Sequence, residues 1–256
     1  MAQIRFSPED STDDILEEFI ELFNKVKDMG FIESHRQHNT GIGKTLEDIC
    51  NIPENNLSSP DFKNIEIKSQ RDYTTSSISL VTKSPDFPAK ANNNLRERYG
   101  YADTNFPEVK CLRIRVGPEY NNVKNKWGFR LKVDRDNERI VFIIKNLEDD
   151  KIEDFNFGYY TSTIKKIIDK LNRIAYVTAK KKDIDGKEYF HFSKFVLVTG
   201  ITYEKVLDLL EKGIIIVEPR LGVYNSGKLK GKKHDHGTAF RINKKDFINE
   251  FNVLEI

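Results

Sequence analysis

The sequence predicts an α+β or mixed α/β fold: a mixed β-sheet core flanked by helices, within a single unit of 256 residues. Segments with helical spacing of apolar residues are interspersed with short segments in which apolar and polar residues alternate. The chain is 38% hydrophobic and holds 17 Phe and 10 Tyr, enough for a core, which excludes wholesale disorder. No apolar run approaches the roughly 20 residues that cross a bilayer, which excludes an integral membrane protein built on helices.

The first expected element is an amphipathic helix whose apolar residues recur at helical spacing from Ile15 to Met29. Ser11 or Thr12 can cap this helix and Gly30 can end it. Residues 45–50 then predict a short helix, and a loop rich in Pro, Asn and Ser follows.

Beyond this loop, alternation of Ile65 and Ile67 with Glu66 and Lys68 predicts a half-buried strand. Two further amphipathic helices are expected over 164–174 and 203–210, the second ending at Gly213. Other strands are expected at 77–82, 112–116, 129–133, 139–145, 175–179, 195–198, 214–217 and 238–242. Neither a linker nor an internal repeat divides the chain.

Charge is unevenly distributed, although the formal net charge is only +2. Residues 1–61 carry 5 basic and 13 acidic side chains, whereas residues 90–135 carry 11 and 5. Residues 220–241 carry 6 basic side chains and 1 acidic one. The two basic segments can form a phosphate-binding surface or can be ordinary solvated faces.

The two cysteines, Cys50 and Cys111, form no CxxC pair, so a disulfide scaffold and a cysteine-based zinc site are not expected. The N-terminal residues turn acidic where a signal peptide would be apolar. These features favour a reducing cytoplasm.

One segment carries residues suited to phosphodiester hydrolysis. Asp61 lies at the turn before the strand at 65–68, on which Glu66 and Lys68 share one face. Two converging carboxylates can hold a hard cation such as Mg²⁺, and a lysine beside them can orient or deprotonate a water. The alternative is an amphipathic strand with a solvated Glu/Lys face.

The segment Gly43-Lys44-Thr45 resembles the end of a phosphate-binding loop, but the motif requires glycine where this chain has His38. We therefore reject nucleotide binding. Glu47, on the short helix after this segment, can add a carboxylate to the candidate site or can be a solvated helix residue.

The segment 234–241 offers donors and acceptors suited to base edges. Arginine pairs with guanine O6 and N7, and aspartate can accept from cytosine N4. His234 and His236 could instead bind a transition metal, but no nearby Cys or His completes such a site. Upstream, the loop 225–233 can follow a phosphate backbone with Lys228, Lys230, Lys232 and Lys233, or can be an exposed basic turn.

The segment 92–101 mixes Asn, Arg and aromatic residues. It can contact the DNA backbone or minor groove, for which Arg96 and Arg98 are the candidates. The alternative is a solvated helix end.

Together these pieces resemble the MvaI/BcnI restriction endonucleases and the related MutH branch of the PD-(D/E)XK nucleases. The resemblance rests on segments 40–48, 59–61, 65–69, 82–85, 95–100, 226–232 and 234–243. Two separated long matches in the same order make it specific, although the nuclease core motif alone is not.

The resemblance implies a restriction-endonuclease-like fold with two lobes around a DNA cleft. The catalytic lobe would cover about 1–110 plus parts of 111–200, and the recognition lobe about 200–256 plus parts of the middle. Asp61 and Glu66 match the metal-binding carboxylates, Lys68 the catalytic lysine, and Glu47 the additional glutamate of the MutH-like branch. Glu218, Arg220, Tyr224, His234, Asp235, His236 and Arg241 match residues that read or border the bases.

Two residues depart from the family pattern: Glu218 stands where Asp is expected, and Pro219 where an aliphatic residue is expected. Because proline removes a ladder donor, we expect an edge strand or a bulge there. Base recognition is affected by these departures, whereas cleavage chemistry is not.

The function implied is a Mg²⁺-dependent type II restriction endonuclease, for which Mn²⁺ can substitute. It would cut double-stranded DNA at CCWGG or a related site, leaving 5′-phosphate and 3′-hydroxyl ends. We expect a cytoplasmic prokaryotic monomer, away from membranes, that serves with a DNA methyltransferase without a stable complex. The alternatives are a MutH-like strand-nicking enzyme and a catalytically silent DNA-binding module.

Overall fold

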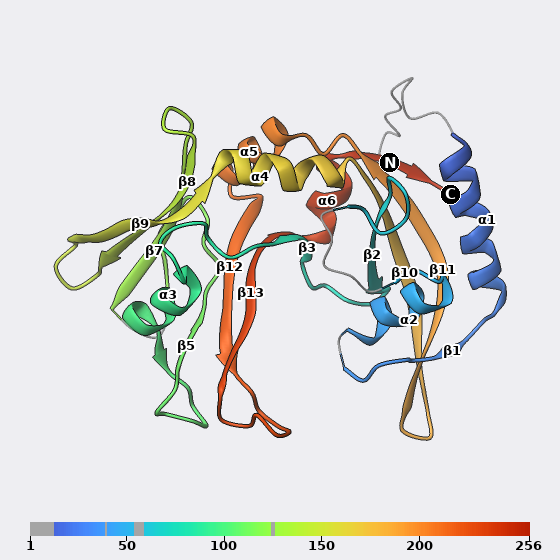
Figure 1. Ribbon diagram of the computed structural model, residues 1–256, viewed down its shortest axis with the longest axis horizontal. Helices are drawn as coiled ribbons and strands as arrows, with labels where there is room; N and C mark the ends of the chain where they lie inside the picture. Colours follow the sequence, from blue (N-terminus) through green and yellow to red (C-terminus); the bar gives the residue numbers. More distant parts are fainter. Residues whose placement is uncertain (1–12, 39, 54–58, 124–125) are drawn as a thin grey trace. The chain divides into compact units, whose positions relative to one another are not determined.

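The computed structural model describes residues 13–38, 40–53, 59–123 and 126–256 (Figure 1). The chain divides into two compact units. Unit 1 comprises residues 1–76, 167–202 and 245–256, and unit 2 comprises residues 77–166 and 203–244. Residues 77–110 fall in unit 2, whereas 167–202 falls in unit 1, which includes parts of 111–200 beside the N-terminal segment.

Unit 1 is built on a five-stranded sheet in the order β1-β11-β10-β2, with β14 also paired to β11. Its strands are β1 (Ile32–Glu33), β2 (Glu66–Arg71), β10 (Arg173–Ile184), β11 (Lys187–Thr199) and β14 (Asn252–Glu255). The β10–β2 pair is parallel and the other pairs are antiparallel, so the sheet is mixed, as predicted. Pairing of β10 with β2 explains why 167–202 joins this unit.

Helices α1 (Asp14–Asp28) and α2 (Gly41–Ile49) share a core with one face of this sheet. Phe19 and Phe23 of α1 both pack edge-on against Phe195 of β11. The N-cap is Asp13, whose carboxylate accepts the amide of Leu16. The expected caps, Ser11 and Thr12, lie outside the described residues. Phe247 of α6 (Lys244–Glu250) contacts Tyr176, whose neighbours in β10 point into the α1–α2 core, so α6 covers the opposite face.

Unit 2 contains an antiparallel sheet in the order β3-β13-β12-β5-β4. Its strands are β3 (Ile78–Thr82), β4 (Tyr101–Ala102), β5 (Lys110–Arg113), β12 (Ile215–Val223) and β13 (Lys233–Ile242). Because β3 pairs with β13, the segment after residue 76 folds with the C-terminal strands. Helices α3 (Ala91–Tyr99) and α5 (Tyr203–Glu211) belong to this unit and pack against strands of the sheet, including β12.

Pro219 was expected to mark either an edge strand or a bulge, and the β12–β13 hairpin shows which of the two is present. β12 is central, not at an edge, and the register with β13 shifts between Pro219 and Leu221. Gly237 on the partner strand has φ of 79°, a left-handed conformation typical of a bulge. The expected bulge is therefore present.

A second antiparallel sheet of unit 2 has the order β6-β7-β8-β9. Its strands are β6 (Asn121–Asn122), β7 (Trp127–Asp134), β8 (Arg139–Asn146) and β9 (Ile152–Tyr160), and β9 was not predicted. The helix expected over 164–174 is shorter: α4 spans Thr161–Ile168, a 3₁₀ turn covers Asp169–Leu171, and β10 begins at Arg173. Across the described residues, no helix is long and apolar enough to cross a membrane.

Candidate active site and nucleic-acid interface

Asp61, Glu66 and Lys68 come together at the start of β2. The chain makes a tight turn in which the amides of Phe62 and Ile65 each donate to the other's carbonyl. This turn brings Asp61 Oδ2 within 2.9 Å of the amide of Ile67. Lys68 Nζ lies 2.6 Å from Glu66 Oε1 on the same face of the strand.

The two carboxylates of this cluster repel each other. Burial and the negative charge of Glu66 raise the pKa of Asp61, although its hydrogen bond from Ile67 and the charges of Lys68 and Lys170 oppose this shift. Glu66 is only 5% exposed, and its Oε2 has no hydrogen-bond partner. A buried carboxylate oxygen without a partner, next to a second carboxylate, calls for a cation.

Mg²⁺ fits this donor set. It is bound through one or two carboxylates and keeps waters or substrate phosphate oxygens as its other ligands. Within the described ranges, no group of three or more His, Cys, Asp or Glu residues gathers as a metal site. Two carboxylates suit a hard cation that keeps waters among its ligands.

Glu47, the third expected carboxylate, is carried by α2, which packs against β2. A Cβ built on Gly43 would be 3.8 Å from Glu47 Oε1 and 3.7 Å from Ser69 Oγ. Lys170 is a nearby cation that the sequence analysis missed, because the 3₁₀ turn that carries it was expected to be helix.

In unit 2, the residues expected to read bases lie on one face of the β12–β13 hairpin, except Asp235, which is the cross-strand partner of buried Leu221 and is bonded to Asn92. Glu218 and Arg220 alternate with buried Val217 and Leu221 along β12. Arg241 on β13 donates to Glu218 Oε2 and, at 2.6 Å, to the carbonyl of Ser77. Arg220 donates to the carbonyl of His236 at 2.7 Å, across the bulge. Both guanidiniums are thus held in place by the hairpin itself.

Three rings form a stack beside these arginines. The rings of Tyr224 and His234 are parallel with centroids 3.8 Å apart, and His236 lies 3.6 Å from His234. Burial, His234, Arg113 and Arg220 lower the pKa of His236, against the opposing charge of Asp235. Burial and repulsion by Arg241 likewise lower the pKa of Arg220. Several cationic groups therefore crowd one face, as expected where an anionic ligand is to bind.

Residues of helix α3 hold this hairpin through side-chain hydrogen bonds. The amide of Asn92 donates to Ser84 Oγ and to both oxygens of Asp235, while its oxygen accepts the hydroxyl of Thr238 at 2.7 Å. Asp235 Oδ1 also accepts the amide of Gly237 at 2.7 Å. The sequence analysis missed Asn92, since nothing in a run of asparagines marks one of them as buried.

Arg96 does not fit the expected contact with a DNA phosphate. It is 4% exposed, and its Nη2 donates to the carbonyl of His234 at 3.0 Å. Its role in the structure is to hold the hairpin. Arg98, by contrast, is exposed and lies over the rings of Tyr99 and Phe157.

The cationic loop between β12 and β13 is short and closed by backbone bonds between Tyr224 and residues 231 and 232. Lys228, Lys230 and Lys232 are exposed on it. Lys233 pairs with Glu97 Oε1 at 2.6 Å. The three loop lysines are thus available for a phosphate backbone, while Lys233 is partly neutralised.

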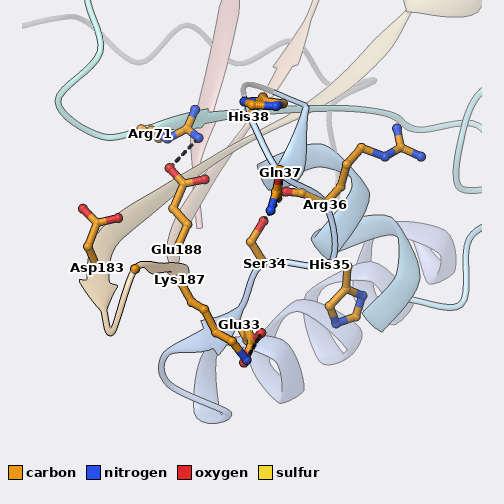
Figure 2. Close-up of a pocket in the computed structure, with 11 residues that line it drawn as sticks. Glu33, Ser34, His35, Arg36, Gln37, His38, Arg71, Asp183, Lys187 and Glu188 are labelled. Carbon is orange, nitrogen blue, oxygen red and sulfur yellow. Dashed lines mark hydrogen bonds and ion pairs between the residues drawn. The ribbon is translucent and has the colours of Figure 1, made fainter. Parts of the chain in front are cut away.

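A polar pocket of about 500 Å³ lies elsewhere in unit 1 (Figure 2). It is lined by residues 33–38, Arg71 and the tip of the β10–β11 hairpin. Arg71 pairs with Glu188 across it, and Lys187 pairs with Glu33, each at 2.8 Å. Arg71 ends β2, whereas Glu66 begins it, so this pocket is separate from the carboxylate cluster.

Comparisons with known proteins point to one family. The model of the MvaI/BcnI restriction endonuclease family matches residues 20–251. The solved complex of restriction endonuclease MvaI with cognate DNA is 34% identical, covers 96% of this chain and 99% of its own, and has a TM-score of 0.88. MvaI in the absence of DNA matches with the same identity and coverage, at a TM-score of 0.59. No curated protein matches. With this family model spanning most of its length, the chain belongs to the MvaI/BcnI restriction endonuclease family.

Proposed function

We propose that this restriction endonuclease hydrolyses double-stranded DNA in a Mg²⁺-dependent reaction at CCWGG or a closely related site, leaving 5′-phosphate and 3′-hydroxyl ends. The observation that carries the metal dependence is the orphaned, buried Oε2 of Glu66 beside the carboxylate of Asp61. The target site is supported by the 34% identity to MvaI over almost the whole chain.

Each residue of the catalytic cluster has a distinct part. Asp61 and Glu66 would hold the cation, and Mn²⁺ is suited to the same oxygen donors. When bound, the ion would polarise the scissile phosphate and lower the pKa of a water. Lys68, fixed by Glu66, would orient the water that attacks phosphorus in line with the departing 3′ oxygen. Glu47, on α2, would add a further carboxylate to the metal site.

The hairpin face would select the site in the major groove. Arg220 and Arg241 can each pair with guanine, and Glu218 can accept from cytosine N4. Asp235 has the same chemistry, but its Oδ1 is already engaged by Gly237 and Asn92. Tyr224, His234 and His236 would border the bases as one stacked group. Lys228, Lys230, Lys232 and Arg98 would contact phosphates, with a weaker contribution from Lys233.

We further propose that the enzyme works as a monomer in the cytoplasm, beside a methyltransferase that protects the host site without a stable complex. The free thiols of Cys50 and Cys111 are consistent with a reducing compartment.

Labelled duplexes test the proposal. Duplexes that carry CCWGG and each single-base variant are incubated with the enzyme in Mg²⁺, Mn²⁺ or EDTA. We expect cleavage of CCWGG only, in the presence of either ion, with ligatable 5′-phosphate ends. Cleavage in EDTA would refute the metal dependence, and preferred cleavage of another duplex would refute the target. Products nicked in one strand only would point to a strand-nicking enzyme.

A further inference from the structure

Gly222 occupies an unexpected place for glycine, inside the central strand β12. Glycine weakens a strand, and its presence often marks a close approach of another group. Gly222 is not among the residues with positive φ, so the backbone conformation does not require it. A Cβ built there would lie 2.3 Å from Nη2 of Arg113 and 3.1 Å from both Cζ and Nε. The guanidinium of Arg113 thus fills the space that a side chain at 222 would need.

The positive charge of Arg113 lies among the residues proposed to read bases. Arg113 ends β5 and is the cross-strand partner of Arg220. Gly222 is the cross-strand partner of His234 on β13, the other neighbour of β12 in the sheet. The guanidinium therefore reaches across β12 toward the Tyr224–His234–His236 stack, and its charge contributes to the lowered pKa of His236.

Arg113 is exposed, and its guanidinium forms no ion pair with a carboxylate in the part of the chain that the structure describes. Arg241, by comparison, is paired with Glu218. An exposed guanidinium that is laid over a glycine has fewer accessible rotamers but keeps its donors open. Such an arrangement lowers the entropic cost of binding a planar acceptor.

We propose that Arg113 is a base-reading residue of this enzyme, and that Gly222 is present to hold its guanidinium in the reading position. The proposal rests on the proposed function of the hairpin face as the major-groove surface. The ligand is a guanine edge, whose O6 and N7 accept the two parallel bonds that a guanidinium donates.

A double-mutant cycle tests this inference. Arg113→Ala, Gly222→Ala and the double variant are compared with wild type for equilibrium binding to the cognate duplex and to each single-base variant at one salt concentration. Arg113→Ala is expected to weaken cognate binding about 5- to 150-fold and to flatten the preference at one base pair. Gly222→Ala should act in the same direction, because its Cβ displaces the guanidinium. The double variant should bind no more weakly than Arg113→Ala.

Thermal unfolding checks that the fold is intact, since the new Cβ meets only the end of a flexible side chain. Arg115→Ala, an exposed arginine just beyond β5, is the matched control and should keep the base preference. Equal weakening on every duplex by Arg113→Ala would make it a phosphate contact and overturn the proposal. An undiminished cost of Gly222→Ala in the Arg113→Ala background would overturn the role of the glycine. Wild type without any sequence preference would instead refute the proposed function itself.

Discussion

Lys68 Nζ lies 2.6 Å from Glu66 Oε1, while the other oxygen of Glu66 is buried without a partner. The two residues share one face of β2 because side chains alternate along a strand. One oxygen of the Glu66 carboxylate thus accepts a hydrogen bond from Lys68, and the other is left for the proposed cation. In the proposed mechanism, this arrangement lets the spacing Glu-x-Lys serve phosphodiester hydrolysis.

Lys68→Met should lower the rate of DNA cleavage by about 100- to 10,000-fold, the usual contribution of a positioned proton-transfer group. Specific DNA binding should remain, because the hairpin face belongs to unit 2. Single-turnover cleavage and a binding titration measure the two effects separately. Lys63→Met is the control, since Lys63 pairs with Glu18 on the surface. Comparable losses in both variants would show that Lys68 has no special part.

Arg241→Ala should weaken cognate DNA binding by roughly 1–3 kcal/mol and relax the preference at one base pair. The guanidinium is already held by Glu218 and Ser77, so it reaches the DNA in a fixed orientation. Glu218→Gln should produce a smaller loss at the same base pair, because it loosens the arginine. Binding to single-base variants measures both. A uniform loss across all sequences would reassign Arg241 to a phosphate.

Asn92→Leu should lower the free energy of unfolding by about 1–3 kcal/mol, because Asp235 and Thr238 lose a hydrogen-bond partner. Cognate DNA binding should weaken as well, since the bulge at Gly237 is then held less firmly. Chemical denaturation and a binding titration provide the two values. Asn93→Ala, exposed on the same helix, should change neither. Unchanged stability in Asn92→Leu would contradict the anchoring role.

His236 should titrate below its ordinary pKa of 6.5. His234, Arg113 and Arg220 oppose its protonation together with burial, and only Asp235 favours it. Because the folded-state pKa is depressed, the stability linked to neutral His236 is present above pH 6.5 and is lost as pH falls through the lower value. NMR titration of the imidazole measures it. Arg113→Ala should raise this pKa, and an unchanged value would place Arg113 farther away than the structure does.

Helices with strong apolar periodicity were predictable from the sequence. The helix from Ile15 follows its pattern, and Gly30 adopts φ of 70° just after it ends. Strand β9 was missed although aromatic residues at 155, 157 and 159 alternate with Asn156 and Gly158, because acidic residues precede them and glycine is depleted in strands. The helix expected to reach residue 174 stops early, since Ile174 is buried as part of β10. Periodicity there reports burial, but not which element supplies it.

The clustering of Asp61, Glu66 and Lys68 was predictable because these residues lie within eight positions on one turn and strand. The anchors of the hairpin were not, since Asn92 and Arg96 act on residues more than 130 positions away. A buried arginine that donates to a carbonyl and an exposed one that contacts phosphate look identical in a sequence. Gly222 was a visible signal, because a glycine inside a strand often marks a close approach of another group.

The most direct test is a digest of a fully sequenced plasmid in Mg²⁺, with wild type beside Asp61→Ala, followed by end sequencing. Loss of a metal-holding carboxylate removes several kcal/mol of transition-state stabilisation, which at about 1.4 kcal/mol per tenfold abolishes visible turnover. We expect discrete fragments cut within CCWGG from wild type only, while Asp61→Ala still binds the site. Cutting by Asp61→Ala at the wild-type rate would contradict the account.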